Sequence, residues 1–193
     1  MVETVKPRRR QARGERRIAQ LLDAAAEVFA AEGYVAATTN AIAAAAGVSP
    51  GTLYQFFPNK ESMGEALADR YLEALVLAHE QDAGRQISGV PLDDVIDRMV
   101  DPAIRIASEN AGFTAVFHWS ERLQTAVVDQ VDALLAVRVA ALDPSRRRLV
   151  AVVTVKIFEA LLPSLLAISG PSRAGMTVEL KRVLRAYLLD ISD

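Results

Sequence analysis

Side chains that could contact nucleic acid are concentrated in the range Thr38–Glu61, which reads TTNAIAAAAGVSPGTLYQFFPNKE. Gly47 can adopt the positive φ of a tight turn, Ser49 is a favourable N-cap, and Pro50 sits in a first helical turn, where its missing N–H costs nothing. The range therefore predicts a short helix, a glycine turn and a second helix, followed by a third helix that starts at Lys60. This order is typical of a helix-turn-helix, whose second helix enters the major groove of DNA.

The side chains at the two helix starts determine which contacts with DNA are available. Pro50 and Thr52 are short enough for close approach to the groove. Gln55 can form a bidentate pair with adenine, and Thr52 can touch a thymine methyl or a polar base edge. We expect the Tyr54 hydroxyl to reach a phosphate. The first helix of the range is expected to start at a Thr38/Thr39 cap, where Thr39 either simply caps or caps while presenting its hydroxyl and backbone N–H to a phosphate.

Lys60 is expected in the first turn of the third helix, where a cation opposes the helix dipole. An anionic group should compensate this charge. Glu61 could supply part of the compensation within the chain, whereas a DNA phosphate above the helix N-terminus would satisfy both the dipole and the lysine. We favour the phosphate as the partner.

The same window contains a second motif, because Gly47-Val48-Ser49-Pro50-Gly51 matches the G-x-S-x-G nucleophile elbow of α/β-hydrolases. An elbow requires a preceding strand, whereas an alanine-rich helical pattern precedes this segment. The chain has two distant histidines, His79 and His118, and no cysteine. Neither a catalytic constellation nor a clustered metal site is apparent. We therefore expect no enzymatic activity, no metal and no cofactor.

Hydrophobic residues recur with a helical period along the chain, and no stretch shows sustained strand-like alternation. We predict an all-α protein of about nine helices. The first helix should end at Gly33, the fifth should open at Pro91 and kink at Pro102, and the last should start at about Thr177.

Three parts are expected along the chain. Residues 1–13 form a flexible basic arm, and residues 14–74 form a DNA-binding domain of three helices plus the start of a longer one, with the helix-turn-helix at about 38–57. Residues 75–193 form a helical domain, entered through a loop at Asp82 to Pro91.

Charge is distributed unevenly along the chain. Its formal net charge is −2, but seven basic and two acidic residues precede Ile18, so this end carries +5 and the remainder −7. A basic arm on an acidic body is what a localised phosphate-binding surface looks like, although a basic tail can also serve solubility alone.

The most apolar stretch, residues 149–168, has nearly the length of a membrane span but contains Lys156, Glu159 and Pro163. Charges at mid-membrane are costly, so we predict a helix buried among other helices or in a subunit interface, with no membrane partner. Lys156 and Glu159 could pair on a solvated edge or face an interface or pocket. The N-terminus lacks the order of a signal peptide, and a cytoplasmic location is expected.

The window and the helix before it resemble the TetR/AcrR family of bacterial transcriptional regulators over roughly residues 14–74. The matching residues are Phe29-Ala30-Ala31-Glu32-Gly33-Tyr34, Thr38-Thr39, Ile42-Ala43, Ala46-Gly47-Val48-Ser49, Gly51, Leu53-Tyr54, Phe57 and Lys60-Glu61. The resemblance implies a homodimer that binds a palindromic DNA operator, with a helical C-terminal domain that holds a small effector and dimerises through its last two long helices.

The resemblance also implies roles for individual residues. Asn40 matches a position that can reach a base, and Thr52 and Gln55 match recognition positions. Phe56 replaces a tyrosine or histidine common in the family, so the polar contact of that ring is lost. The positions that match phosphate contacts are Thr39, Tyr54 and Lys60.

Together these features predict a ligand-responsive regulator, a repressor released by a small, largely apolar effector. The candidates for the effector pocket are Met99, Phe113, Phe117, His118, Trp119 and Phe158, because such pockets are mostly apolar with a few polar groups. Aromatic residues and methionine at helical spacing are also typical of an ordinary core. The alternative function is an effector-independent or architectural DNA-binding protein that uses the same helix-turn-helix.

Overall fold

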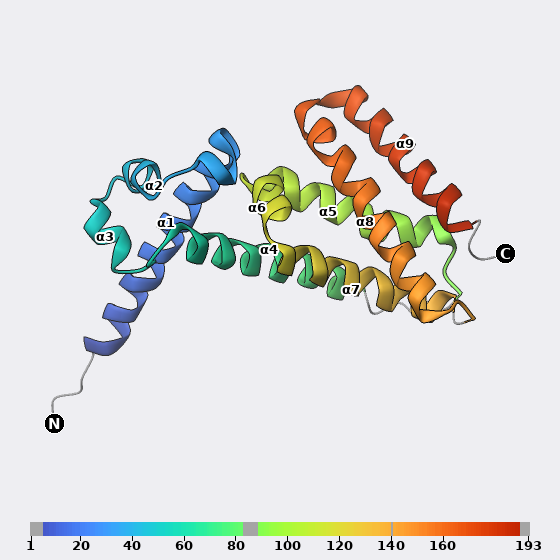
Figure 1. Cartoon of the computed structure of the whole chain (residues 1–193), viewed down its shortest axis with the longest axis horizontal. Coiled ribbons are helices and arrows are strands. Elements are labelled where there is room, and N and C mark those ends of the chain that lie inside the picture. The colour runs from blue at the N-terminus through green and yellow to red at the C-terminus, as the bar shows by residue number, and fades with distance from the viewer. Residues whose placement is uncertain (1–5, 83–88, 140, 190–193) are drawn as a thin grey trace. The chain divides into compact units, whose positions relative to one another are not determined.

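The computed structural model describes residues 6–82, 89–139 and 141–189 (Figure 1), and the side chains of residues 12–78, 89–139 and 141–189. Every regular element in these ranges is a helix, as predicted, and the nine helices agree with the expected number. They are α1 (Lys6–Ala36), α2 (Thr39–Ala45), α3 (Pro50–Tyr54), α4 (Lys60–Asp82), α5 (Leu92–Glu109), α6 (Phe113–Trp119), α7 (Glu121–Arg138), α8 (Pro144–Ala167) and α9 (Gly170–Leu189).

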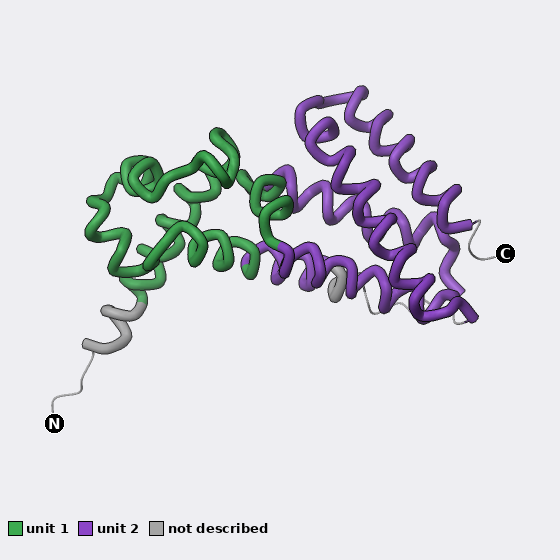
Figure 2. The backbone as a smooth tube through the Cα atoms, in the orientation of Figure 1, with its two compact units in different colours: residues 1–69, 110–120 green, residues 70–109, 121–193 purple. Residues whose placement is uncertain are grey.

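The helices form two compact units (Figure 2). The N-terminal unit consists of residues 1–69 and 110–120, and the C-terminal unit of residues 70–109 and 121–193. The sequence placed α6 in the second domain, but the structure groups it with the first. Its Phe113, Val116 and Phe117 are buried and the helix packs on α1, since a seven-residue helix needs a neighbour to cover its apolar side.

Helix α1 begins at Lys6, so residues 6–13 are helical and the prediction of a flexible arm there was wrong. Arginine, glutamine and alanine favour helix, and Pro7 occupies the first turn, where it is tolerated. Residues 1–5 of the predicted arm lie outside the described residues. Gly33 has φ 78° and interrupts the regular helix, which confirms the predicted end, and a short helical turn continues to Ala36.

An aromatic cluster joins α6 to the rest of the N-terminal unit. The rings of Tyr34 and Trp119 stack with centroids 4.0 Å apart, and Phe29 packs against Tyr34 at 5.0 Å. The buried Tyr34 hydroxyl has no hydrogen-bond partner among the described residues. Burial, with repulsion from Glu61 and Glu65, raises the pKa of Tyr34 above its usual value, so this phenol stays neutral.

In the C-terminal unit, α5 packs on α9, and α8 packs on both α7 and α9. Helix α5 continues past Pro102, and α9 starts at Gly170, so the predicted start at Thr177 was wrong. The Gly170-Pro171 pair that stops α8 also begins the next helix, because proline is tolerated in a first turn. Residues 83–88 of the expected loop lie outside the described residues.

Ion pairs tie these helices together along their edges. Lys181 of α9 bonds Asp97 at 2.9 Å and Asp101 at 2.6 Å on α5, and Arg185 bonds Asp93. Although burial opposes its charge, the hydrogen bonds to Asp101 and Asp97 raise the pKa of Lys181. On the other side, α8 is bonded to α7 by the pairs Arg147–Asp132 and Arg148–Asp129.

Helix α8 is the one helix in the described part of the chain that is long and apolar enough to cross a membrane. Here it packs between α7 and α9 with Val150, Ala151 and Leu162 among its buried residues. Lys156 and Glu159 pair at 2.6 Å, with 55% of the lysine and 9% of the glutamate side chain exposed. The two residues therefore pair with each other, but the buried glutamate shows that the pair is not on a fully solvated edge.

Gly64→Ala should destabilise the N-terminal unit by about 1–3 kcal/mol, because overpacking forces neighbouring groups apart. A Cβ at Gly64 would lie 2.6 Å from Trp119 Cζ3 and 2.9 Å from Tyr34 Cε2. Thermal unfolding followed by circular dichroism measures the effect. The matched control is Gly14→Ala in α1, where a Cβ meets nothing within 4 Å, and which should be neutral or stabilising. Equal behaviour of the two variants would show that the ring packing does not require a glycine.

Candidate nucleic-acid interface

In the helix-turn-helix, the Gly47 turn and the Ser49 cap are where the sequence predicts them, but Thr38 and not Thr39 caps α2, because Thr39 is already the first helical residue. Thr38 Oγ1 accepts a hydrogen bond from Ala41 N at 3.1 Å at the start of α2. Gly47 has φ 64° and turns the chain between α2 and α3. Ser49 Oγ accepts from Thr52 N at 3.1 Å and caps α3, whose first residue is Pro50. The serine of the G-x-S-x-G motif is therefore a helix cap.

Two hydroxyl groups join α2 to α3 on the outside of the motif. Thr39 Oγ1 and Tyr54 Oη lie 2.9 Å apart and share a hydrogen bond. Half of the Tyr54 side chain is exposed. One proton is used between the two groups, so the other remains available to an external acceptor such as a phosphate oxygen.

Of the residues expected to contact bases or the groove, Asn40, Pro50 and Gln55 are exposed and Thr52 is half-buried. Asn40 and Gln55 make no side-chain hydrogen bond within the described part of the chain, so their amides are free to pair with a base edge. Thr52 Oγ1 lies 3.0 Å from Ser49 Oγ. That contact orients the threonine and leaves its methyl group for an apolar contact.

The opposite side of the motif is a small core. Ile42, Leu53 and Phe57 are buried, as their spacing predicts, and the α1 stripe that covers them includes Leu21 and Phe29. Because these apolar groups fix one side of α2 and α3, the polar residues must face outward.

The structure gives Lys60 a partner that was not considered. Its Nζ donates to the carbonyl oxygens of Tyr34 at 2.8 Å, Val35 at 3.0 Å and Ala37 at 3.0 Å, and lies 4.8 Å from the centre of the Tyr34 ring. An ammonium has three donors, so all are used. The carbonyl end of α1 carries the negative end of a helix dipole and compensates the cation. These contacts compensate the cation within the chain, and a phosphate contact of Lys60 stays a prediction.

Gln20 positions the interface and was missed in the sequence. Its Nε2 donates to Ala46 O, at the end of α2, at 2.7 Å, and its Oε1 accepts from Arg17 Nη1 at 2.9 Å. A helix that ends at a glycine turn leaves carbonyls that need donors, and this is the signal that could have suggested such a residue. No local spacing identifies a partner 26 residues away.

Comparison with known proteins decides the family. Residues 21–67 match the family described as "Bacterial regulatory proteins, tetR family", and residues 91–188 match "Tetracyclin repressor-like, C-terminal domain". The chain belongs to the TetR family. As a TetR-family protein it is a transcriptional regulator, and the helix-turn-helix described above is its DNA-binding domain.

Relatives of this TetR-family chain include the uncharacterized HTH-type transcriptional regulator YhgD of Bacillus subtilis (strain 168), 27% identical over 157 residues that cover 74% of this chain and 80% of that protein. A TetR-family regulator from Streptomyces coelicolor is 26% identical, covers 89% of this chain and 97% of its own, and has a TM-score of 0.66. The regulator FadR from Bacillus subtilis, in complex with stearoyl-CoA, shares the fold at 18% identity, with 86% and 96% covered and a TM-score of 0.66.

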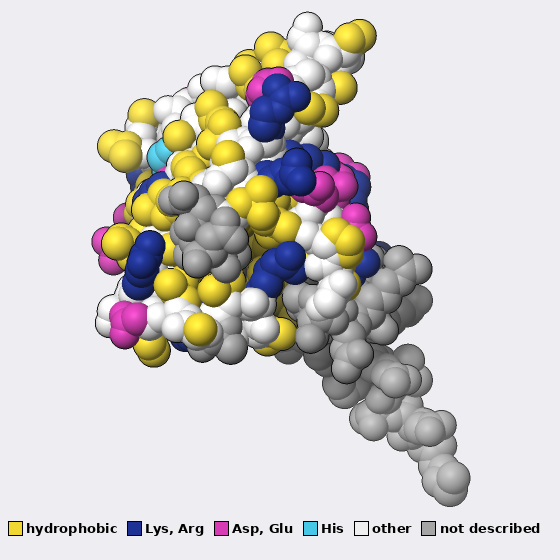
Figure 3. Space-filling view, turned by 90° about the vertical axis from the view of Figure 1, so that its right-hand side faces the viewer, with side chains coloured by type: hydrophobic (Ala, Val, Ile, Leu, Met, Phe, Trp, Pro, Cys, Tyr) yellow, Lys and Arg dark blue, Asp and Glu magenta, His cyan; other side chains and the backbone are white. Residues whose placement is uncertain are grey.

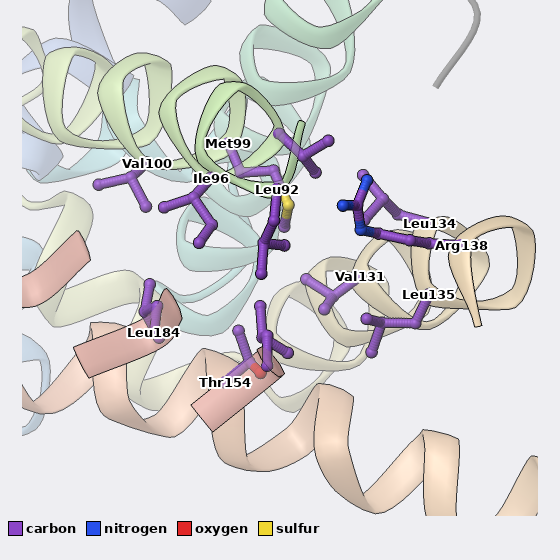
Figure 4. A pocket seen from close by; sticks show the side chains of 12 residues that line it. Leu92, Ile96, Met99, Val100, Val131, Leu134, Leu135, Arg138, Thr154 and Leu184 are labelled. Atoms are coloured by element: carbon purple, nitrogen blue, oxygen red, sulfur yellow. The ribbon is translucent and has the colours of Figure 1, made fainter. Parts of the chain in front are cut away.

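The residues expected to form an effector pocket are divided between the two units. Met99 and Phe158 line small apolar cavities between α5, α7, α8 and α9 (Figure 4). Phe113, Phe117, His118 and Trp119 belong to α6 in the N-terminal unit and do not line these cavities. The Trp119 ring stacks on Tyr34, and His118 is exposed with Nδ1 3.0 Å from Thr114 O. Of the six, Met99 and Phe158 are the ones that line these two cavities.

Lys60→Met should lower the stability of the N-terminal unit by about 1–3 kcal/mol, because three carbonyls at the end of α1 lose their donor. The slope of log K for DNA against log salt should stay unchanged, since the donors of the ammonium are already used within the chain. Unfolding and DNA titrations at several salt concentrations measure both quantities.

Arg182→Met is the control for the loss of a surface cation, because Arg182 pairs with Glu179 on an exposed edge. It should change stability by less than about 1 kcal/mol. If Lys60→Met instead leaves stability intact and reduces the salt slope by about one, the lysine binds a phosphate and its capping role is secondary.

Proposed function

We propose that this chain is a cytoplasmic, ligand-responsive repressor that binds a palindromic operator as a homodimer and is released by a small apolar effector. The observation that carries the proposal is the outward-facing set of groups on α2 and α3, in which the Thr39–Tyr54 hydroxyl pair flanks two exposed amides. Neutral hydroxyl groups can donate hydrogen bonds to phosphate oxygens, and side-chain amides can form hydrogen bonds that distinguish base edges.

The division of roles follows from these contacts. Asn40, Thr52 and Gln55 read bases, and Pro50 allows close approach to the groove. Thr39 and Tyr54 hold phosphates. Further phosphate attraction comes from the basic start of α1, where Arg13 and Arg16 are exposed.

A homodimer is supported by apolar surface on the last two helices. Leu149 of α8 is 62% exposed, and Val178 and Val183 of α9 are 54% and 47% exposed. On the face of the C-terminal unit seen in Figure 3, hydrophobic side chains also lie open between charged ones. Dimerisation would bring two DNA-binding domains to one operator, with their recognition helices about 34–36 Å apart. Once one domain is bound, binding of the second domain would be intramolecular.

Effector control is supported by the cavities of the C-terminal unit. They lie among four helices that include α8 and α9, the helices proposed for the dimer contact. A ligand that enlarged these cavities would shift the two helices and change the spacing of the two DNA-binding domains in the dimer. Couplings of this kind are worth about 1–3 kcal/mol, or roughly 5- to 150-fold in DNA affinity.

The DNA role is tested by selecting binding sites from random duplexes with the purified full chain. We expect a palindrome that binds at least about 10³-fold more tightly than random duplex at equal salt. Gln55→Ala should lose about 1–3 kcal/mol of discrimination at one position per half-site, because a base pair contact is removed. Tyr54→Phe should weaken selected and random duplexes by a similar factor, because a phosphate contact reads no sequence.

The two variants control for each other, since both change an exposed side chain at the end of α3, Tyr54 as its last residue and Gln55 as its C-cap. If Tyr54→Phe alters the selected sequence while Gln55→Ala does not, the assigned roles are reversed. A ratio near one between palindrome and random duplex for the wild-type chain would favour the architectural alternative.

Val178→Asp should shift the protein from dimer to monomer in sedimentation velocity, because an unpaired carboxylate would be buried in the proposed interface. The matched control is Leu77→Asp, which places the same charge at a comparably exposed position, 49% exposed, on α4. The control should remain a dimer. Dimerisation unaffected by Val178→Asp but lost in Leu77→Asp would place the interface on α4.

A further inference from the structure

The cavities of the C-terminal unit have one charged group at their edge. Arg138, the last residue of α7, lines the first cavity together with Thr154 and ten aliphatic or thioether side chains. Figure 4 shows its side chain extending from α7 toward the side lined by Met99. A cation at a helix C-terminus is stabilised by the dipole, but the dipole does not occupy its N–H groups.

The guanidinium has few partners of its own. Its Nη1 donates to Val90 O at 2.7 Å, and within the described part of the chain it forms no ion pair. The side chain is half-buried. Of the five N–H donors of a guanidinium, one is used within the described part of the chain, and a partly desolvated cation favours a carboxylate or another anion beside it. The neighbouring cations Arg147 and Lys181, by contrast, are each paired with aspartate.

The rest of the lining offers no second donor. Thr154 Oγ1 donates to Val150 O at 2.9 Å, so its proton is used within α8. The second cavity continues to Ala103 and Phe158, and the phenyl ring of Phe158 is the single aromatic group that lines either of these two cavities. The residues that the two cavities share are Met99, Val100, Val131, Thr154 and Leu184. From Leu92 to Ala103 along α5, the lined length is about 16 Å.

We infer that the effector bound in this interior is an aliphatic monocarboxylate, with its alkyl chain between α5, α7, α8 and α9 and its carboxylate on Arg138. This inference rests on the proposed function and names the ligand class of its effector site. The aliphatic walls suit a flexible methylene chain better than a planar ring system, and the elongated, narrow space suits a chain that enters by displacing side chains such as Met99. Arg138, the one cation among the described residues that line these two cavities, then selects a single anionic end.

The test compares decanoate with decanol, which has the same chain length without the charge. Isothermal titration calorimetry is carried out on the full chain, with decanoate below its critical micelle concentration and decanol below its solubility limit. The wild type should bind decanoate at least about tenfold more tightly than decanol, because a charge-assisted pair is available to the carboxylate alone. Arg138→Gln should bind both compounds equally, and Arg138→Lys should keep part of the preference.

The matched control is Arg146→Gln, which removes the same charge from an exposed position at the start of α8 and should keep the full preference. Failure of the wild type to bind decanoate, equal binding of decanoate and decanol, or an unchanged preference in Arg138→Gln would each overturn the inference. The wild-type comparison decides the question even if a variant does not fold.

Operator binding is measured on the same preparation. A wild-type chain that binds its selected palindrome but not decanoate contradicts the ligand class and leaves the DNA role intact. Tighter binding of decanoate than of decanol supports the ligand class. If the protein binds decanoate in this way but does not release the operator, the inference on the ligand class stands and the proposed effector role is contradicted.

Discussion

The contact between the Lys60 ammonium and the end of α1 is the constraint on which the DNA-binding unit depends. Three carbonyls, of Tyr34, Val35 and Ala37, accept its protons. Helices α2 and α3 lie in the chain between these two points, so the contact closes a loop that contains the whole motif. The positive φ at Gly33 makes it possible, because it turns the last carbonyls of α1 out of the helix ladder and toward the lysine.

Within that closed loop, hydrogen-bonded hydroxyl pairs and apolar contacts restrict the movement of the DNA-facing side of α2 and α3. Ser49 is held by Thr52, Thr39 by Tyr54, and Gln20 anchors the end of α2. Rigid presentation of this kind lowers the entropy lost on binding. Asn40 and Gln55, which have no side-chain partner among the described residues, are the ones whose chemistry distinguishes bases, so rigidity and specificity belong to different residues of the motif.

The C-terminal unit differs from the DNA-binding unit, because ion pairs join its helices along their edges while its interior is loosely packed. Lys181 and Arg185 join α9 to α5, and Arg147 and Arg148 join α8 to α7. Between these edges the packing is aliphatic and leaves small cavities. Side chains such as Met99 can rearrange at little cost, whereas the ion pairs keep the helices in register. Such an interior can accept a ligand and pass the resulting strain to the helices proposed for the dimer contact.

The sequence by itself determined the helices of the motif, their caps and the turn, because these depend on interactions within a few residues: Thr38 and Ser49 cap their own helices, and Gly47 needs no distant partner. It also identified Tyr54 and Gln55 from their places near the start of the second helix of the motif, while Asn40 came from the resemblance to the TetR family. Only the tertiary structure decided the partner of Lys60, the anchoring role of Gln20 and the placement of α6 against α1. Each of these is a contact between residues far apart in the chain, and helical periodicity shows that a face must be covered without showing what covers it. For the same reason Trp119 and Phe113 looked like pocket residues in the sequence, while the structure uses Trp119 against Tyr34 and buries Phe113 within the same unit.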